Sequence, residues 1–193
     1  RRMTAANANS IVMLLNGAPV DMSAWVDGCG AVLEAWYPGE QGAQALTEIL
    51  FGDVNPGAKL PITFPRSVGQ LPLFYCAKPS GRGHGYVEND GSPLYPFGYG
   101  LSYTKFEYRG LKLNTDKIAA GETVTASVTV ANIGDRAGVA VPQLYIRDWV
   151  SSTVKPERYL CGFTRVELEP GEEKTVEITI GERSMRTLNE DYI

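Results

Sequence analysis

Three carboxylates lie near the ends of apolar segments in the first forty residues. Asp21, Glu34 and Glu40 each follow an apparent strand. Loops after the C-terminal ends of parallel strands commonly carry active sites, and carboxylates there could serve as a general acid and base. Structural roles are the commoner interpretation: Asp21 could cap a helix, and Glu40 in the first turn of a helix would suit the positive end of its dipole.

Two aromatic residues and a glycine-rich loop add candidates for ligand binding. Trp36 and Tyr37 could stack on a sugar ring, although packing in a core or against another domain is the commoner role. His84, the single histidine, lies near Arg82 in the loop. Both could reach a neighbouring substrate pocket through hydrogen bonds, or they could be exposed residues without chemistry. The candidate substrate-binding residues are therefore Trp36, Tyr37, Glu40, Arg82 and His84, and no residue is assigned a catalytic role.

Metal, cofactor and redox chemistry find little support in the sequence. The three cysteines, Cys29, Cys76 and Cys161, are far apart and form no Cys-x-x-Cys pair. We expect three free thiols that behave as small buried hydrophobes. The glycine-containing stretches at 55–59 and 81–85 lack the spacing of a phosphate-binding loop. We expect no metal site and no cofactor.

Charge and hydropathy restrict the possible partners. The chain has a formal net charge of -4 and carries no run of Lys and Arg, so it is a poor candidate for binding a nucleic acid backbone. No apolar stretch approaches the roughly 20 residues that a membrane-spanning helix needs. With 44% hydrophobic and 21% charged residues, the composition is that of a soluble globular chain. The compartment, whether cytoplasmic, periplasmic or secreted, stays open.

The elements that would carry these candidates have an α/β pattern. Residues 10–15 form a continuous apolar run, which predicts a central parallel strand with both faces covered. Residues 31–33 repeat this pattern, and residues 23–26 predict a short helix between the two strands. An amphipathic helix is expected over residues 40–51, ended by Gly52.

A change of composition follows this segment. Residues 53–104 are rich in Pro, Gly and aromatic residues, which predicts a long connection without long helices. From residue 106 the pattern becomes β, with strict alternation of apolar and polar residues over 124–130. Pro142 predicts a bulge or an edge, and the segments 166–168 and 176–180 predict a hairpin around an intervening turn. We place the domain boundary near residue 105.

Several segments, taken in order, resemble the C-terminal part of family 3 glycoside hydrolases. Residues 38–65 (PGEQGAQALTEILFGDVNPGAKLPITFP) and 94–104 (LYPFGYGLSYT) resemble two hallmarks of that family. Residues 9–20 resemble the strand that follows the family's acid/base region. The segments 141–148, 155–165 and 168–174 resemble its fibronectin type III-like domain. One departure is local: the family usually has Gly-Gln-Glu-Gly where this chain has Gly-Glu-Gln-Gly at 39–42.

The resemblance implies a fold in two parts. Residues 1–104 would be the later half of an α/β sandwich domain, a partial sandwich of parallel-type strands and helices. Residues 105–193 would be an all-β fibronectin type III-like sandwich without its last strand. The implied partners are a barrel domain and the first half of the α/β sandwich, in missing sequence or a companion chain. Without them, an exposed apolar patch is expected on residues 1–52.

The resemblance also implies an activity. Members of the family are similar in being retaining, exo-acting glycosidases that release terminal non-reducing β-D-glucosyl or related residues. Their nucleophilic Asp lies on the barrel, and their acid/base Glu lies upstream of the strand that residues 10–15 resemble. Both catalytic carboxylates are therefore expected outside this chain, which would serve as scaffold and pocket wall. The alternative is a non-catalytic carbohydrate-binding or adhesion module built on the fibronectin-like domain.

Overall fold

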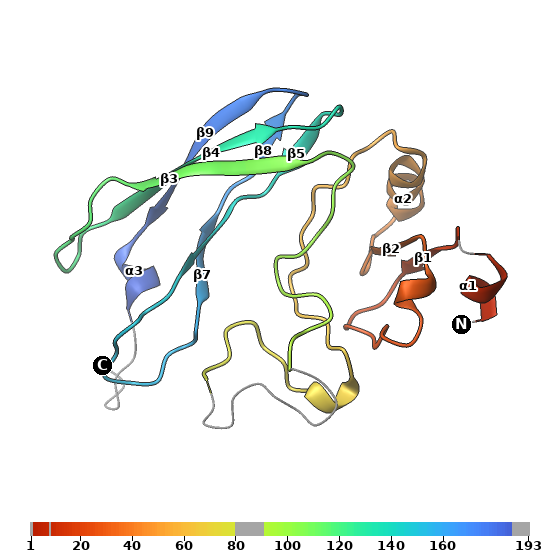
Figure 1. Cartoon of the computed structure of the whole chain (residues 1–193), viewed down its shortest axis with the longest axis horizontal. Coiled ribbons are helices and arrows are strands. Elements are labelled where there is room, and N and C mark those ends of the chain that lie inside the picture. Colours follow the sequence, from red (N-terminus) through yellow and green to blue (C-terminus); the bar gives the residue numbers. More distant parts are fainter. Residues whose placement is uncertain (1, 8, 80–90, 187–193) are drawn as a thin grey trace. The chain divides into compact units, whose positions relative to one another are not determined.

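The chain forms two compact units. The computed structural model describes residues 2–7, 9–79 and 91–186 (Figure 1). The first unit comprises Arg1–Val54, Leu60–Tyr75 and Ser80–Tyr99. The second comprises Asn55–Lys59, Cys76–Pro79 and Gly100–Ile193. Within the described residues, no helix combines the length and the apolar character that a membrane crossing requires.

A pair of parallel strands forms the centre of the first unit. β1 (Ile11–Leu14) pairs in parallel with β2 (Ala31–Glu34), as the two apolar runs predict (Figure 1). The expectation that both faces of the first strand are covered is wrong for this chain. Ile11 and Met13 are 51% and 43% exposed, whereas Leu14 packs against the core of the unit. The described residues thus cover one face of β1 and leave the other open.

The connection between these strands contains a tighter helix than the sequence predicts. The expected helix at 23–26 is a turn that leads into the 3-10 helix η1 (Val26–Gly28). The Asp21 carboxylate accepts hydrogen bonds from the backbone N–H and the hydroxyl of Ser23, at 3.1 and 2.6 Å. Asp21 therefore stabilises the start of this turn, in line with its structural interpretation.

The expected amphipathic helix is present but begins later. α2 runs over Gly42–Phe51, so Glu40 lies in the turn before the helix and not in its first turn. Gly52 ends the helix in a left-handed conformation with φ of 83°, which glycine adopts without strain. The other short helices are α1 (Arg2–Ala6), η2 (Val68–Gln70) and α3 (Glu182–Met185).

A small aromatic and aliphatic core holds the first unit together. Met22, Val26 and Phe64 are its buried members, and Phe64 is 1% exposed. Backbone hydrogen bonds join Phe64 to Tyr95, so two parts of the long connection meet in this core. Residues 60–75 and the described residues 91–99 of the connection therefore belong to the first unit.

The described residues of the second unit form three small antiparallel sheets, several of whose strands are labelled in Figure 1. The largest contains β3 (Phe106–Leu113), β4 (Val124–Asn132) and β9 (Glu173–Ile180) in that order. The other two pair β5 (Gly138–Ala140) with β8 (Val166–Leu168) and β6 (Gln143–Ile146) with β7 (Tyr159–Phe163). Val130, Ala140 and Leu168 are buried in a shared core.

The strands of this unit agree with the sequence pattern, but one pairing does not. β8 and β9 occupy the two arms of the expected hairpin, yet β8 pairs with β5 and β9 pairs with β4. The turn between them bonds to the end of β4, because Gly171 N–H donates to the Asn132 carbonyl and Asn132 N–H donates to the Glu172 carbonyl. Pro142 separates β5 from β6, so the chain changes sheets there.

The Asn-Pro-Gly-Ala-Lys stretch at 55–59 has a structural role in the second unit. The Asn55 side-chain amide donates to the Ala137 carbonyl at 2.8 Å. Its oxygen accepts from the Ser102 hydroxyl and the Tyr103 N–H, both at 2.8 Å. The Lys59 ammonium donates to the Gly100 carbonyl. These contacts explain the stretch without a bound ligand.

Asn132 is a fully hydrogen-bonded polar group in the core of the second unit. The residue is 1% exposed, and its side-chain amide donates to the carbonyls of Arg136 and Leu168 at 2.7 and 3.0 Å. Its side-chain oxygen accepts from the Thr104 hydroxyl at 2.6 Å and from the Gly134 N–H at 3.1 Å. One buried side chain thus joins β4, the end of β8 and two loops.

We predict that Asn132→Leu destabilises the second unit by about 3 kcal/mol, because several buried polar groups lose their partner while the volume changes little. Native-state hydrogen exchange of the β4 and β9 amides measures this loss. The matched control is Asn114→Ala, which removes an exposed side-chain acceptor for Thr125 N–H and should change protection by less than about 1 kcal/mol. Unchanged protection in Asn132→Leu would contradict the role given to this side chain.

Candidate functional site

The C-terminal edge of the parallel pair gathers polar and aromatic residues. Leu14 lies beside Glu34 in the register, so the segments after β1 and β2 leave the sheet at the same edge. Asn16 follows β1, and Glu34, Trp36 and Tyr37 end or follow β2. This edge is where open α/β sheets commonly bind ligands.

Two polar atoms at this edge are buried without a partner in the described part of the chain. Glu34 Oε1 accepts a hydrogen bond from Trp36 N–H at 3.0 Å. Among the residues that the structure describes, neither Glu34 Oε2 nor Asn16 Oδ1 has a hydrogen-bond partner, although both atoms are buried. Native proteins satisfy most buried polar atoms, so two exceptions at one edge indicate a functional or an incomplete site.

Burial changes the acid strength of Glu34. Loss of solvent raises the pKa of the Glu34 carboxyl above its ordinary value, and the hydrogen bond from Trp36 N–H partly opposes this rise. Asn16 was not singled out from the sequence. An Asn directly after an apolar run was the available signal, but Asn-Gly is also a common turn pair.

Trp36 contributes mainly to the core. Its ring lies 6.0 Å from the Phe64 ring, centroid to centroid, and packs beside the buried residues of the first unit. Its backbone has φ of 52°, a left-handed conformation that is uncommon for a large side chain. Such strain is retained where the surroundings over-determine it, often at functional sites. Here the Trp36 N–H bond to Glu34 and the packed ring hold the conformation.

Tyr37 is the exposed aromatic residue of the edge. Its side chain is 82% exposed, and its ring lies against the backbone at Gly17. A Cβ atom at residue 17 would overlap the phenol, so glycine permits this close approach. Tyr37 can therefore offer a ring and a hydroxyl to a ligand or to another part of the protein.

The remaining candidates from the sequence are residues other than Asn16 and Glu34, whose side-chain oxygens are buried at this edge. Glu40 is exposed in the turn before α2. Asp21 is engaged by Ser23, as described above. Arg82 and His84 lie outside the described residues. Of the residues predicted to bind a ligand, the structure therefore brings Trp36 and Tyr37 to one edge.

Other candidate residues have structural surroundings. Cys29, Cys76 and Cys161 are free and half-buried. No group of three or more His, Cys, Asp or Glu side chains suited to a metal is found among the described residues. The aromatic rings of the connection stack within the first unit, as in Tyr95 against Tyr99 with centroids 5.0 Å apart.

Two family models match the chain. The first, described as the glycosyl hydrolase family 3 C-terminal domain, covers residues 1–103, and the second, a fibronectin type III-like domain, covers residues 140–192. A "Beta-xylosidase" of Formosa agariphila is 44% identical over 94% of this chain and 25% of its own length. A "Periplasmic beta-glucosidase" of Salmonella typhimurium is 40% identical over 93% of this chain and 25% of its own length.

Solved structures show the same relationship. A β-glucosidase from Erythrobacter marinus is 45% identical with a TM-score of 0.90, over 95% of this chain and 24% of that protein. A β-glucosidase from Listeria innocua in complex with glucose is 31% identical with a TM-score of 0.92, over 99% of this chain and 28% of that protein. The chain thus spans about a quarter of the length of these relatives.

We predict that Glu34→Gln stabilises the chain at neutral pH by about 1 kcal/mol, because an amide is easier to bury than a carboxylate with one unpartnered oxygen. The raised pKa also sets the sign of the pH dependence. The contribution of Glu34 is fully present below the unfolded pKa of about 4.3 and is lost as the pH rises through the folded value.

Urea denaturation of wild type and Glu34→Gln between pH 4 and 8 measures both effects. The two curves should converge at low pH and separate as the pH rises. Glu40→Gln is the matched control, since its carboxylate is exposed, and it should change stability by less than about 0.5 kcal/mol. A Glu34→Gln variant that is less stable than wild type at pH 7 would contradict the unpartnered state of Glu34 Oε2.

Proposed function

Because the chain belongs to glycosyl hydrolase family 3, we propose that its complete protein is a retaining, exo-acting glycosidase of the β-glucosidase or β-xylosidase kind. Such an enzyme releases terminal non-reducing β-D-glucosyl or related residues. The observation that carries the proposal is the match of the family's C-terminal domain to residues 1–103. Relatives that carry the names β-glucosidase and β-xylosidase, at 40% and 44% identity, support it.

In this proposal, the catalytic carboxylates lie outside the chain. Retention of configuration needs two carboxyl groups about 5–5.5 Å apart, one as nucleophile and one as acid/base. Three quarters of each relative has no counterpart here, which leaves room for both groups. The acidic residues near the C-terminal edge have other surroundings: Asp21 bonds to Ser23, and Glu34 is buried and bonds to Trp36 N–H.

The proposed role of this chain is scaffold and pocket wall. Residues 1–104 would be the later half of an α/β sandwich domain, and residues 105–193 a fibronectin type III-like domain. Trp36, Tyr37 and Glu40, with Arg82 and His84, would line one side of a pocket that the rest of the protein completes. The exposure of Tyr37 supports a sugar contact for this residue, whereas the ring of Trp36 is already packed on Phe64.

The partners proposed for this chain are a barrel domain and the first half of the α/β sandwich. The open face of β1 supports this view, because parallel strands are normally covered on both faces. Ile11, Met13 and Leu15 alternate along that face and are 43% to 61% exposed. A neighbouring strand or helix could bury them, and a donor from the same region could satisfy Asn16 Oδ1 and Glu34 Oε2.

We expect this chain alone to give no turnover of p-nitrophenyl β-glucoside or p-nitrophenyl β-xyloside, because it would lack both catalytic groups. The chain together with its natural upstream sequence should hydrolyse at least one of them. Release of p-nitrophenol, followed by absorbance, measures both. Activity of the chain alone that survives repurification would place catalysis within it, and an inactive longer protein would favour the non-catalytic module.

The open face of β1 gives a second test. We predict that the isolated chain binds a hydrophobic dye such as ANS, and that the double variant Ile11→Thr, Met13→Thr reduces the fluorescence by about half, since it removes two exposed apolar side chains from one face. A matched control is Leu111→Thr, an exposed apolar residue on β3 of the other unit. A longer protein that still binds the dye through Ile11 and Met13 would contradict the proposed cover.

A further inference from the structure

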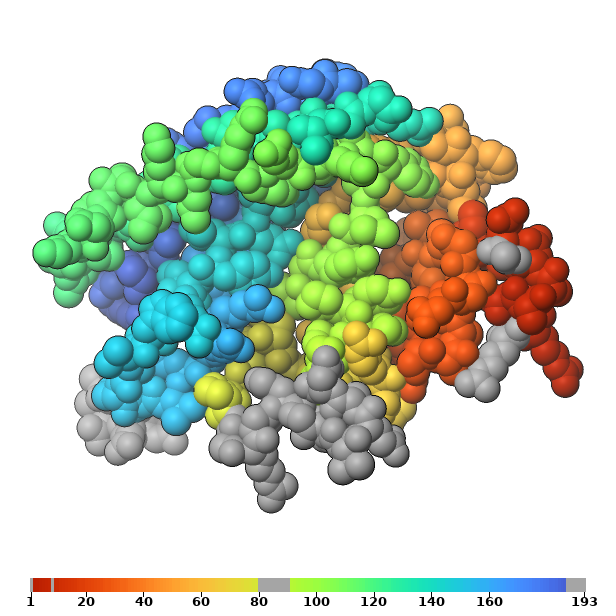
Figure 2. Space-filling model, in the orientation of Figure 1, coloured from red at the N-terminus to blue at the C-terminus, as the bar shows by residue number. Residues whose placement is uncertain are grey.

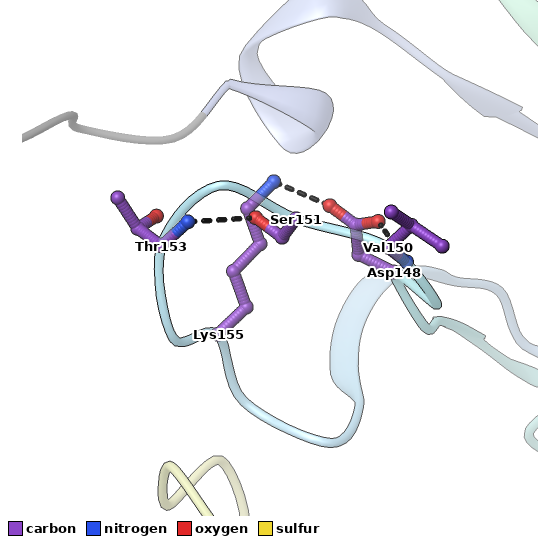
Figure 3. A network of polar contacts seen from close by, with 5 residues as sticks. All are labelled: Asp148, Val150, Ser151, Thr153 and Lys155. Carbon is purple, nitrogen blue, oxygen red and sulfur yellow. Dashed lines mark hydrogen bonds and ion pairs between the residues drawn. The ribbon is translucent and has the colours of Figure 1, made fainter.

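The loop between β6 and β7, residues 147–158, is held in shape by its own polar contacts. The Lys155 ammonium forms an ion pair with Asp148 Oδ2 at 2.5 Å, and Asp148 Oδ1 accepts from Val150 N–H at 3.3 Å (Figure 3). The hydrogen bond from Lys155 lowers the pKa of the Asp148 carboxyl below its ordinary value. Thr153 N–H donates to the Ser151 hydroxyl across the same turn (Figure 3). Both charged side chains are largely shielded, at 20% and 29% exposure, so the two ends of the turn are joined by a partly buried ion pair.

The β6–β7 loop, which the Lys155–Asp148 ion pair holds in shape, exposes apolar side chains to solvent. Trp149 is 79% exposed, Val150 90% and Val154 59%. Figure 2 shows the atoms of the loop, in cyan to light blue, at the molecular surface. Tryptophan side chains are largely buried on average. An exposed Trp149 in a loop that an ion pair holds in shape is therefore unusual.

The charged side chains next to Trp149 contact its ring or one another. The Arg147 guanidinium lies over the Trp149 ring, 4.0 Å from its centroid, and also forms an ion pair with Glu157 at 3.4 Å. Arg147 therefore supports one face of the indole and leaves the opposite face available to a ligand. The Arg147 and Glu157 side chains are 46% and 58% exposed, so donors and an acceptor border the ring.

We propose that the β6–β7 loop binds a neutral oligosaccharide by stacking a sugar ring on the free face of Trp149. A pyranose ring has a flat C–H face and a rim of hydroxyl groups. An exposed indole matches the first, and the Arg147–Glu157 pair can exchange hydrogen bonds with the second. The ion pair between Lys155 and Asp148 sets the orientation of the ring before binding, which lowers the ordering cost.

Charge and size disfavour other ligands at this loop. Arg147 and Lys155 are each paired with a carboxylate, and Arg158 lies over the Tyr145 ring at 6.0 Å from its centroid, so the loop offers no cluster of free cations for a phosphate backbone. A tryptophan side chain supplies on the order of 200 Å² of contact, whereas a stable protein interface buries about 800 Å² on each partner. A small neutral ligand with one apolar face fits the surface better than either.

The choice of a β-linked glucan as ligand rests on the proposed function, whereas the stacking site itself does not. A non-catalytic sugar site in this unit would hold a polymeric substrate near the complete enzyme and raise its local concentration. Because the loop needs no catalytic group, sugar binding by the loop and turnover by the complete enzyme can each be absent without the other.

The test is titration of the chain with laminaritetraose, cellotetraose and maltotetraose, followed by isothermal calorimetry and saturation-transfer NMR. We expect millimolar binding of at least one β-linked tetrasaccharide. Trp149→Ala should weaken it by about tenfold or more, and Trp149→Phe, which keeps a ring, should weaken it less. Phe163→Ala is the matched control, because this exposed aromatic lies at the opposite end of the β6–β7 ladder, and it should bind like wild type.

The outcomes separate the site from its ligand class. Loss of binding in Trp149→Ala with an unchanged melting temperature supports the site. Binding of maltotetraose alone, lost in the same variant, keeps the stacking site but contradicts the β-linked ligand drawn from the proposed function. No binding of any of the three sugars, or equal binding by wild type and Trp149→Ala, overturns the proposal. A change of oligomeric state in Trp149→Ala without sugar binding also overturns it, in favour of a protein contact.

Discussion

Parallel strands need cover on both faces, and this requirement governs the first unit. β1 and β2 are short, and the residues of this chain bury only one side of β1. The other side exposes Ile11 and Met13. At the neighbouring edge, two buried acceptors find no donor among the residues that the structure describes. The exposed apolar face and the unsatisfied atoms have a common explanation if further strands or helices of a longer protein lie against this pair. The relatives, about four times as long, have the additional sequence that such cover would require.

The arrangement of the second unit depends on hydrogen bonds that satisfy its buried polar groups. Asn132 has four good partners in a site that excludes water, and the turn after β8 bonds to its backbone. These contacts explain why β8 and β9 separate into different sheets although a tight turn joins them. A local hairpin would have paired the two strands, but the buried amide and the end of β4 bind the turn instead.

The two places that could contact a ligand differ in how they are built. At the C-terminal edge of β1 and β2, a desolvated carboxylate and an exposed phenol lie in a setting that the rest of the protein would complete. In the β6–β7 loop, a tryptophan is supported within the loop by Arg147 and by the ion pair of Asp148 with Lys155. The first is therefore expected to depend on domain assembly, and the second is expected to act within its own unit.

The family resemblance, most of the strands and the helix that Gly52 ends could be predicted from the sequence. These features depend on local properties: apolar period, turn residues and the left-handed conformation that glycine allows. The sequence also indicated Trp36 and Tyr37, because they follow a strand, but not that one ring is packed and the other exposed. Four features became visible only in the folded chain: the partner of β8, the open face of β1, the exposed Trp149 and Asn16 Oδ1, which has no partner among the described residues. Each of these features depends on contacts between residues that are far apart in the sequence. A local sequence pattern carries no information about such contacts.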